Sequence, residues 1–174
     1  MTIIFETDRL ILREIDVKAD LDRWCEMMAD EDTVRYIGGK TLGRAECWRQ
    51  MATIIGHRKI RGYGFWSVVE KSSGQFIGRV GPWFPEGWPE PEIGWTIMKD
   101  ATRKGYAKEA GAACIHYAFN TLGWDRCIHV IDKDNIGSIK TAETLGSHRM
   151  YKIDSLGGGV LDATNCWAYG QVKG

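Results

Sequence analysis

The sequence feature that most constrains the fold is a pair of β-rich runs joined by a short polar turn. Residues 64–84 read GFWSVVEKSSGQFIGRVGPWF, and the two runs lie on either side of Ser72, Ser73 and Gly74. Branched and aromatic residues favour strands, and two such runs around a glycine-containing turn are typical of an antiparallel hairpin. The chain is therefore expected to form a sheet that contains antiparallel strands.

The periodicity of apolar residues predicts further strands and helices. Alternation of polar and apolar residues indicates strands, whereas apolar residues that recur every three or four positions indicate helices. These patterns predict an α+β fold, with a mixed and mostly antiparallel sheet of about seven strands flanked by about four helices, because only the helix after Gly105 looks like a crossover. Residues 1–174 are expected to form a single domain. Besides the hairpin, the predicted strands span residues 9–15, 91–97, 126–131, 148–153 and 165–172, and the predicted helices span residues 16–28, 44–58, 105–120 and 135–145.

Composition and charge narrow the class of protein. The apolar content of 44% and the charged content of 26% are typical of a globular protein. No stretch approaches the roughly 20 apolar residues of a membrane span, and the start, MTIIFETDRLILRE, does not resemble a signal peptide. We therefore expect a cytoplasmic protein with no membrane partner. A net charge of zero weighs against nucleic acid, because phosphate binding normally requires a basic excess.

The cysteines and histidines give no sign of a metal or disulfide framework. The five cysteines are odd in number and contain no C-x-x-C pair, so they are interpreted as reduced and mostly buried thiols. Cys114 lies within a helical run, which favours core packing over a covalent acyl intermediate. His116 and His129 lack a metal-binding partner at a standard spacing, so no metal is expected.

A basic turn before the helix at residues 105–120 indicates an anion-binding site. A helix N-terminus carries unpaired backbone N–H groups and a partial positive charge, both of which suit a phosphate. Gly105 and Ala107 permit close approach, and Arg103, Lys104 and Lys108 add charge. The turn lacks both the G-K-[ST] of a P-loop and the G-x-G-x-x-G of a dinucleotide fold. An ordinary helix start with solvated basic side chains is the alternative.

Six short segments, in order along nearly the whole chain, carry a resemblance to a known family. With them the chain resembles the GNAT superfamily of acyl-CoA-dependent N-acetyltransferases, and within it the Rim-type branch, which acetylates protein N-termini and small amines. The resemblance implies the GNAT fold and acetyl-CoA as co-substrate. The segments are TDRLILR from residue 7, DEDTVRYIGG from residue 30, GRVG from residue 78, EIGWTI from residue 92, KGYAKEA from residue 104 and NIGSIKTAETLG from residue 135.

The resemblance implies that the basic turn wraps the pyrophosphate of coenzyme A. Thr102, Gly105 and Ala107 match the family's Q/R-x-x-G-x-G/A pattern, although Thr102 replaces the usual Gln or Arg and Arg103 stands where a second glycine is common. Backbone N–H groups make the contact, so the mechanism does not depend on those side chains. Through their backbone, the residues at the end of the preceding strand are expected to contact the pantetheine arm. The implied cofactor-binding residues are Ile97, Met98, Lys99, Arg103, Lys104, Gly105, Tyr106, Ala107, Lys108, Asn135 and Ser138.

Glu92 is the candidate general base. An amine must lose a proton before it attacks a thioester, and free amines are mostly protonated at neutral pH. On an alternating strand Glu92 shares a face with Gly94 and Thr96, and the glycine leaves room beside the carboxylate. Glu90 and Glu86 are the rivals. A surface or salt-bridged glutamate at a strand end is the alternative.

Ser138 is the candidate donor to the departing thiolate. Many GNAT proteins use a tyrosine on the last helix, but the matching position here, counted from Asn135, is Ala142. Ser138 is the nearest hydroxyl, and Rim-type relatives suggest that it hydrogen-bonds the sulfur of coenzyme A. Asn135 either contacts the pantetheine amides or only caps its helix.

Tryptophans and prolines precede the candidate base in the segment GPWFPEGWPEPEIGW at residues 81–95. Trp83 and Trp88 are candidate substrate-binding walls, with ordinary packing at a sheet edge as the alternative. The nearby carboxylates Glu86, Glu90 and Glu92 favour a cationic amine. A peptide N-terminus, a polyamine and an aminoglycoside fit equally well.

These observations predict an acetyl-CoA-dependent N-acetyltransferase that transfers the acetyl group directly to a small-molecule or peptide amine, without a metal. A non-catalytic acyl-CoA sensor is the first alternative, because the tyrosine is absent and the turn is altered. A different anion binder, such as a nucleotide-binding protein, is the second. A monomer and a homodimer are both compatible with the sequence.

Overall fold

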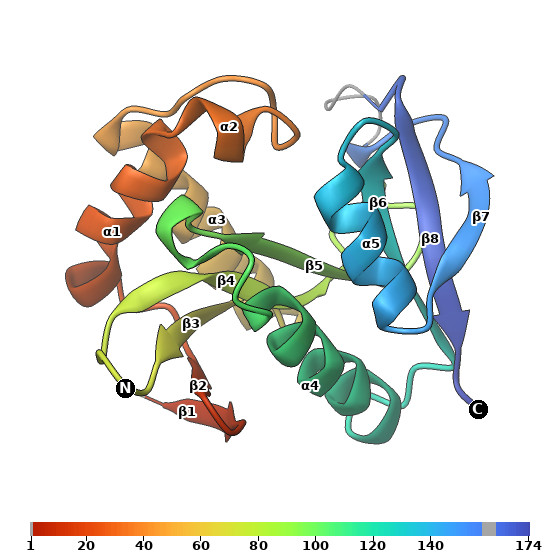
Figure 1. Ribbon diagram of the computed structural model, residues 1–174, viewed down its shortest axis with the longest axis horizontal. Coiled ribbons are helices and arrows are strands. Elements are labelled where there is room, and N and C mark those ends of the chain that lie inside the picture. The colour runs from red at the N-terminus through yellow and green to blue at the C-terminus, as the bar shows by residue number, and fades with distance from the viewer. Residues whose placement is uncertain (1, 158–162) are drawn as a thin grey trace.

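A computed structural model describes residues 2–157 and 163–174, and this part of the chain is built around one sheet of 8 strands (Figure 1). Every neighbouring pair of strands is antiparallel except β5 and β6, which are parallel. Across the sheet the strands are β1 (Ile3–Glu6), β2 (Leu10–Arg13), β3 (Trp66–Glu70), β4 (Phe76–Trp83), β5 (Glu92–Ile97), β6 (Arg126–Asp132), β8 (Cys166–Val172) and β7 (His148–Lys152).

Helices cover both faces of the sheet (Figure 1). On one face lie α1 (Val17–Ala29) and α3 (Arg44–Arg61), and on the other lie α4 (Tyr106–Asn120) and α5 (Ile136–Thr144). A single turn, α2 (Glu31–Val34), follows α1, and a 3-10 turn, η1 (Lys99–Ala101), follows β5. The predicted α+β class, with a mixed and mostly antiparallel sheet flanked by helices, is confirmed.

The described part of the chain contains one strand and one helix more than the seven strands and four helices predicted. The additional strand, β1, has four residues, and the additional helix, α2, is a single turn. The side chain of Asp30 caps α2 by accepting a hydrogen bond from the Thr33 N–H, at 2.8 Å. Elements this short do not complete a periodic pattern, so periodicity did not reveal them.

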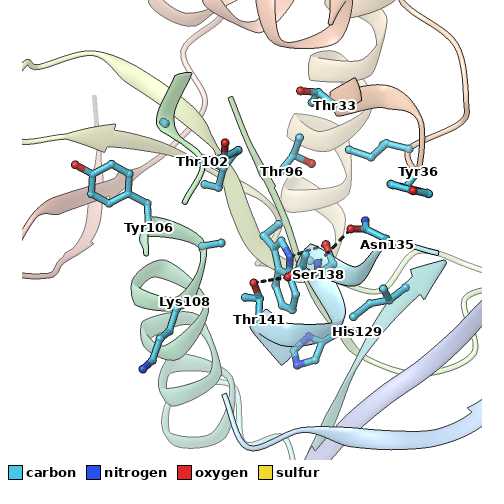
Figure 2. A pocket seen from close by; sticks show the side chains of 18 of the residues that line it. Thr33, Tyr36, Thr96, Thr102, Tyr106, Lys108, His129, Asn135, Ser138 and Thr141 are labelled. Atoms are coloured by element: carbon cyan, nitrogen blue, oxygen red, sulfur yellow. Dashed lines mark hydrogen bonds between the residues drawn. The ribbon is translucent and has the colours of Figure 1, made fainter. Parts of the chain in front are cut away.

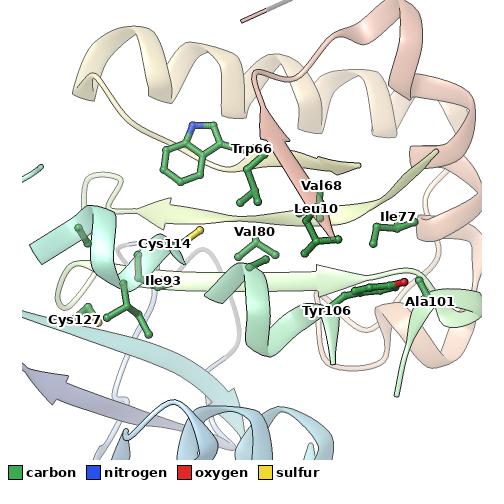
Figure 3. Packing of buried hydrophobic residues seen from close by; sticks show 14 of the residues in the cluster. Leu10, Trp66, Val68, Ile77, Val80, Ile93, Ala101, Tyr106, Cys114 and Cys127 are labelled. Atoms are coloured by element: carbon green, nitrogen blue, oxygen red, sulfur yellow. The ribbon is translucent and has the colours of Figure 1, made fainter. Parts of the chain in front are cut away.

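Hydrophobic cores on both faces hold the helices against the sheet. The core beneath α4 includes Val80, Ile93 and the enclosed Cys114, whose thiol pKa is raised well above its ordinary value by burial (Figure 3). The core beneath α1 and α3 includes Trp24 and Phe65. Cys114 is therefore a packing residue, as predicted.

The single parallel pair is the feature of the sheet that positions the site. The helix α4 connects β5 to β6, and a crossover of this kind makes the two strands parallel. β4 and β5 pair at six positions, whereas β5 and β6 pair only at Glu92 and Ile128. Beyond Glu92, β5 therefore runs without β6 as a neighbour.

A buried ion pair fixes α1 to the sheet. The Asp20 carboxylate is enclosed and accepts hydrogen bonds from Arg13 Nη1 at 2.8 Å, from Arg13 Nη2 at 2.5 Å and from the Ser67 hydroxyl at 2.6 Å. Three elements, β2, α1 and β3, thus meet at one carboxylate. Without the Asp20 carboxylate, the donors of Arg13 and Ser67 would be buried without a hydrogen-bond partner.

The variant Asp20→Ala is expected to lose about 3–5 kcal/mol of the free energy of unfolding, because it leaves the Arg13 guanidinium buried without its partner. Urea denaturation followed by tryptophan fluorescence measures this loss. Asp22→Ala is the matched control on the same helix, since Asp22 is exposed and pairs with exposed Arg44 at 2.6 Å. An equal loss in the two variants would contradict the role of the buried pair.

Candidate active site

A cavity of about 550 Å³ opens where β5 separates from β6 (Figure 2). The separated strands form its walls, together with the segment around α2, the turn before α4 and the first turn of α5. Figure 2 shows Thr96 of β5, His129 of β6 and Ser138 of α5 around this space. Most of the candidate residues from the sequence lie here.

Side chains replace the missing strand pairing at the inner end of the cavity. His129 Nδ1 lies 2.6 Å from the carbonyl oxygen of Ile93, which can only accept, so Nδ1 carries the proton. His129 Nε2 therefore accepts from the Ser147 hydroxyl at 2.9 Å. Burial lowers the pKa of His129 to about 4, and the neutral ring acts as a structural bridge between β5 and β6.

Glu92 lies at the point where the two strands part. Its side chain is 7% exposed and accepts hydrogen bonds from Trp88 Nε1 at 2.6 Å and from the Val130 N–H at 3.3 Å. Burial raises the pKa of Glu92 to about 7, although these two hydrogen bonds and the charge of Arg79 act in the opposite direction. A carboxyl with this pKa exchanges a proton readily at neutral pH.

Glu90 and Glu86, the two other candidates for the base, lie outside the cavity. Glu90 accepts a hydrogen bond from the Tyr151 hydroxyl at 2.5 Å and forms an ion pair with Arg126, also at 2.5 Å. The Glu86 side chain is fully exposed. Neither lines the cavity, so Glu92 alone of the three faces it.

The first turn of α5 places Asn135 and Ser138 in the cavity wall (Figure 2). Asn135 caps the helix, because its Oδ1 accepts from the Ser138 N–H at 3.1 Å. The Ser138 hydroxyl oxygen accepts from Trp95 Nε1 at 3.3 Å. Ala142, where many relatives carry a tyrosine, is enclosed in the core.

The basic turn forms the opposite wall of the cavity. Gly105 is the N-cap of α4, has φ +82° and offers no side chain to cap the helix, so the first N–H groups of α4 lack a side-chain partner. Arg103 also has a left-handed conformation, with φ +61°, at the position where the family commonly has glycine. The predicted residues of this turn that line the cavity are Arg103, Gly105, Tyr106, Ala107 and Lys108.

The β1–β2 loop fixes this turn, an interaction that the sequence did not predict. Arg9 Nη1 donates to the Lys104 carbonyl at 2.9 Å, and Arg9 Nε donates to Glu109 at 2.7 Å. The Thr7 hydroxyl donates to the other Glu109 oxygen at 2.6 Å, and the Arg9 guanidinium lies 4.6 Å from the centroid of the Tyr106 ring. The TDRLILR segment thus holds the basic turn in place.

The segment around α2, residues 30–37, also lines the cavity, and the sequence did not predict this. Lys99 faces the cavity, but its Nζ donates to Asp30 at 3.2 Å and to Asp32 at 2.9 Å, and these contacts raise the pKa of Lys99. The Tyr36 hydroxyl donates to the Asp134 carbonyl at 3.2 Å. This segment therefore bridges the two sides of the opening.

Four of the predicted site residues do not line the cavity. Met98 is buried in the core beneath α1 and α3, and Trp83 stacks on His57 with ring centroids 4.2 Å apart. Trp88 contacts the site through Glu92. Ile97 lines the cavity, whereas Met98, Lys104, Trp83 and Trp88 do not.

The described residues contain neither a metal-binding cluster nor a membrane-spanning helix. No group of three or more His, Cys, Asp or Glu side chains in residues 2–157 and 163–174 is arranged to hold a metal ion. In the same residues, no helix has the length and apolar character that a membrane crossing requires.

Comparison with known sequences gives the same family along most of the chain. A family model described as an acetyltransferase (GNAT) domain matches residues 9–148. The uncharacterized protein YkkB of Bacillus subtilis (strain 168) is 31% identical over 147 residues, which cover 82% of this chain and 83% of that protein. The uncharacterized N-acetyltransferase YjdG of the same organism is 30% identical, over 83% of this chain and 89% of that protein.

Solved structures share the fold at lower identity. An acetyltransferase from Agrobacterium tumefaciens str. C58 superposes with a TM-score of 0.83 at 23% identity, over 97% of this chain and 94% of that chain. RimL, a ribosomal L7/L12 α-N-protein acetyltransferase in complex with coenzyme A, superposes with a TM-score of 0.76 at 16% identity, over 98% of both chains.

The variant Trp88→Phe is expected to raise the pKa of Glu92 further, by about one unit, because it removes a charge-assisted hydrogen bond while keeping an aromatic ring. A titration of the Glu92 carboxyl followed by carbon-13 NMR measures the shift. Trp83→Phe is the control, since Trp83 packs on His57 and donates nothing to Glu92. An unchanged pKa in Trp88→Phe would contradict the contribution of this hydrogen bond.

Proposed function

The chain belongs to the GNAT family of acetyltransferases, and we propose that it catalyses direct transfer of an acetyl group from acetyl-CoA to a primary amine, with Glu92 as the general base. The observation that carries this proposal is the placement of Glu92. A buried carboxyl with a pKa of about 7 lies where β5 and β6 part, in the wall of the cavity that opens there. Few positions in a protein combine access, burial and a pKa near neutrality.

The cavity walls fit coenzyme A in two places. At the N-terminus of α4, N–H groups without a side-chain cap, together with Arg103 and Lys108, suit the pyrophosphate. Along β5, the backbone between Gly94 and Ile97 has no partner strand on its β6 side, so its polar groups suit the amides of the pantetheine arm. When bound there, acetyl-CoA supplies the thioester that the amine attacks.

Glu92 accepts the proton that the amine must lose. Most primary amines are protonated at neutral pH, whereas a carboxyl with a pKa near 7 is about half ionised and ready to accept. The Trp88 and Val130 hydrogen bonds hold the carboxylate in one orientation toward the cavity. A free primary amine, whether on a small molecule or on a peptide N-terminus as in the RimL relative, satisfies this step.

Ser138 stabilises the departing sulfur in this proposal. Its oxygen accepts the Trp95 N–H, which leaves its own proton available to donate into the cavity. A serine is a weak acid, so the hydroxyl acts through a hydrogen bond and not through full proton transfer. This arrangement compensates for the alanine at position 142.

The variant Glu92→Gln is expected to lower kcat by about a hundredfold or more with a primary amine and to leave coenzyme A binding unchanged. Because the base acts when ionised, wild-type kcat/KM rises with pH through a midpoint near 7, and this rise is absent in the variant. Detection of the free thiol of released coenzyme A gives the rates, and calorimetry gives the affinity.

Glu90→Gln is the matched control for the base, since Glu90 lies nearby but is bound to Tyr151 and Arg126. It is expected to retain both kcat and the rise near pH 7. Full activity in Glu92→Gln, or equal losses in the two variants, would contradict the assignment. Tight binding of coenzyme A without turnover in a broad panel of amines would instead favour the acyl-CoA sensor.

The variant Gly105→Ala is expected to weaken binding of coenzyme A by about tenfold. A Cβ at φ +82° costs about 1–2 kcal/mol, and relief of this strain turns the N–H groups away from the pyrophosphate. Gly123→Ala is the control, because Gly123 has φ +72° at the far end of α4 and no atom near an added Cβ. Calorimetry with coenzyme A measures both affinities. Equal affinities in the two variants would contradict this site.

A further inference from the structure

Two cysteines that the proposed reaction does not use meet between α1 and α3. Cys25 lies on α1 and is half-buried, whereas Cys47 lies on α3 and is enclosed. Cys47 belongs to the hydrophobic core beneath these helices, and Cys25 packs against that core. Both side chains are free thiols. Cys25 and Cys47 are called the thiol pair below.

Contacts on both sides of the thiol pair hold α1 and α3 together. On one side, the indole N–H of Trp24 donates to the Gln50 side chain at 2.8 Å. On the other side, the Leu42 N–H donates to the Met28 carbonyl at 3.0 Å. In each of the two chain segments the cysteine lies between these contacts, so the segments run antiparallel and their cysteines lie at the same level.

The two thiols interact directly. Burial, and next a hydrogen bond with the Cys25 side chain, raise the pKa of the Cys47 thiol to about 12. The Arg44 guanidinium, which pairs with Asp22 of α1 at 2.6 Å, also interacts with both thiols. The two sulfur atoms are therefore neighbours across the contact of the helices, which is the arrangement from which a disulfide forms.

The thiol pair lies at the base of a segment that lines the cavity. Between Val34, which is buried, and Leu42, no residue is enclosed. A segment with so little packing opens locally at low cost, so its position depends on how firmly α1 and α3 hold its two ends. The cavity-lining residues between the two cysteines are Asp30, Asp32, Thr33, Tyr36 and Ile37.

We propose that the thiol pair is an oxidation site, which a hydroperoxide converts into a disulfide between α1 and α3 that restrains the cavity-lining segment. This inference goes beyond the acetyl transfer, because it requires neither coenzyme A nor an amine. A disulfide limits the conformations of the loop that it closes, here residues 25–47, and so opposes separation of the two helices. Exchange with a small thiol reverses it.

The difference in exposure sets the order of the two chemical steps. Half-buried Cys25 is accessible to a solute, whereas Cys47 has 0% of its surface exposed. The Cys25 sulfur attacks the peroxide, the O–O bond breaks, and a sulfenic acid forms with release of water or an alcohol. The Cys47 sulfur then attacks the Cys25 sulfur, the S–O bond breaks, and the hydroxyl leaves as water with the proton of Cys47. Two thiols thus lose two electrons and two protons, and the peroxide is reduced.

Treatment of the protein with hydrogen peroxide, followed by mass spectrometry, tests the site. Trypsin cleaves after Arg23, Arg35, Arg44 and Arg49, so the disulfide joins the peptides 24–35 and 45–49. The wild type is expected to gain this joined species at the mass of one chain, to lose two titratable thiols, and to recover both in dithiothreitol. Cys25 joined to any other cysteine or to a second molecule, or oxidised beyond the sulfenic acid with no joined species, would overturn the proposal.

Single variants separate the roles of the two thiols. Cys25→Ala is expected to give no joined species, and Cys47→Ala is expected to stop at a sulfenic acid on Cys25 that dimedone traps. Cys166→Ala is the matched control, because Cys166 is also half-buried but lies on β8, and it is expected to behave as the wild type. Loss of the joined species in Cys166→Ala, or its survival in Cys25→Ala, would contradict the assignment.

Hydrogen exchange tests the restraint separately from the chemistry. In the oxidised protein, the amides of residues 35–43 are expected to exchange at least about threefold more slowly than in the reduced protein, and dithiothreitol is expected to restore the faster rate. The turn at residues 71–75 lies outside the closed loop and is expected to be unchanged. Peroxide-treated Cys25→Ala controls for oxidation of methionines and is expected to exchange as the reduced wild type does. Formation of the disulfide with unchanged exchange at residues 35–43 would overturn the restraint.

Discussion

The separation of β5 from β6 after one paired position is the constraint on which the rest of the site depends. The hydrophobic core beneath α4 fixes this crossover helix against β4 and β5, so β5 continues with β4 and leaves β6. Backbone groups freed inside a protein need partners, and the side chains of His129 and Glu92 each supply one. The opening therefore creates the cavity and, at its inner end, buries the carboxyl of Glu92, the proposed base. One topological feature thus determines both the space for a ligand and the pKa of the group that faces it.

The sequence predicted those parts of the fold and site whose signals are local. The hairpin, the cap at Asn135 and the start of a helix at Gly105 each depend on a few adjacent residues, and all three are present. The clamp between Arg9 and Glu109 joins positions 100 residues apart, and no pattern in a single sequence indicates such a contact. Trp88 was interpreted as a wall for the acceptor because aromatic faces suit an apolar or cationic amine. Its loop, however, folds back and directs the indole N–H toward Glu92.

The conformation of the basic turn explains why the β1–β2 loop is fastened to it. Arg103 has φ +61°, a conformation that costs about 1–2 kcal/mol for a residue with a Cβ. A strained turn persists only where its surroundings hold it, and here Arg9 bonds to the carbonyl of Lys104 directly after Arg103. Glu109 in turn fixes Arg9 and Thr7. Arg103 thus places its charge at the rim of the cavity and keeps the left-handed backbone conformation that a glycine would adopt there.

In the proposed reaction, the two faces of the sheet separate the binding of coenzyme A from the approach of the amine. The turn before α4 and the first turn of α5 lie on one face, whereas Arg79, Phe65 and Glu92 belong to the face beneath α1 and α3. The two faces are connected through the gap between β5 and β6, and Glu92 lies at the inner end of this gap. In the proposed reaction, a thioester held on one side of this gap meets an amine that approaches from the other.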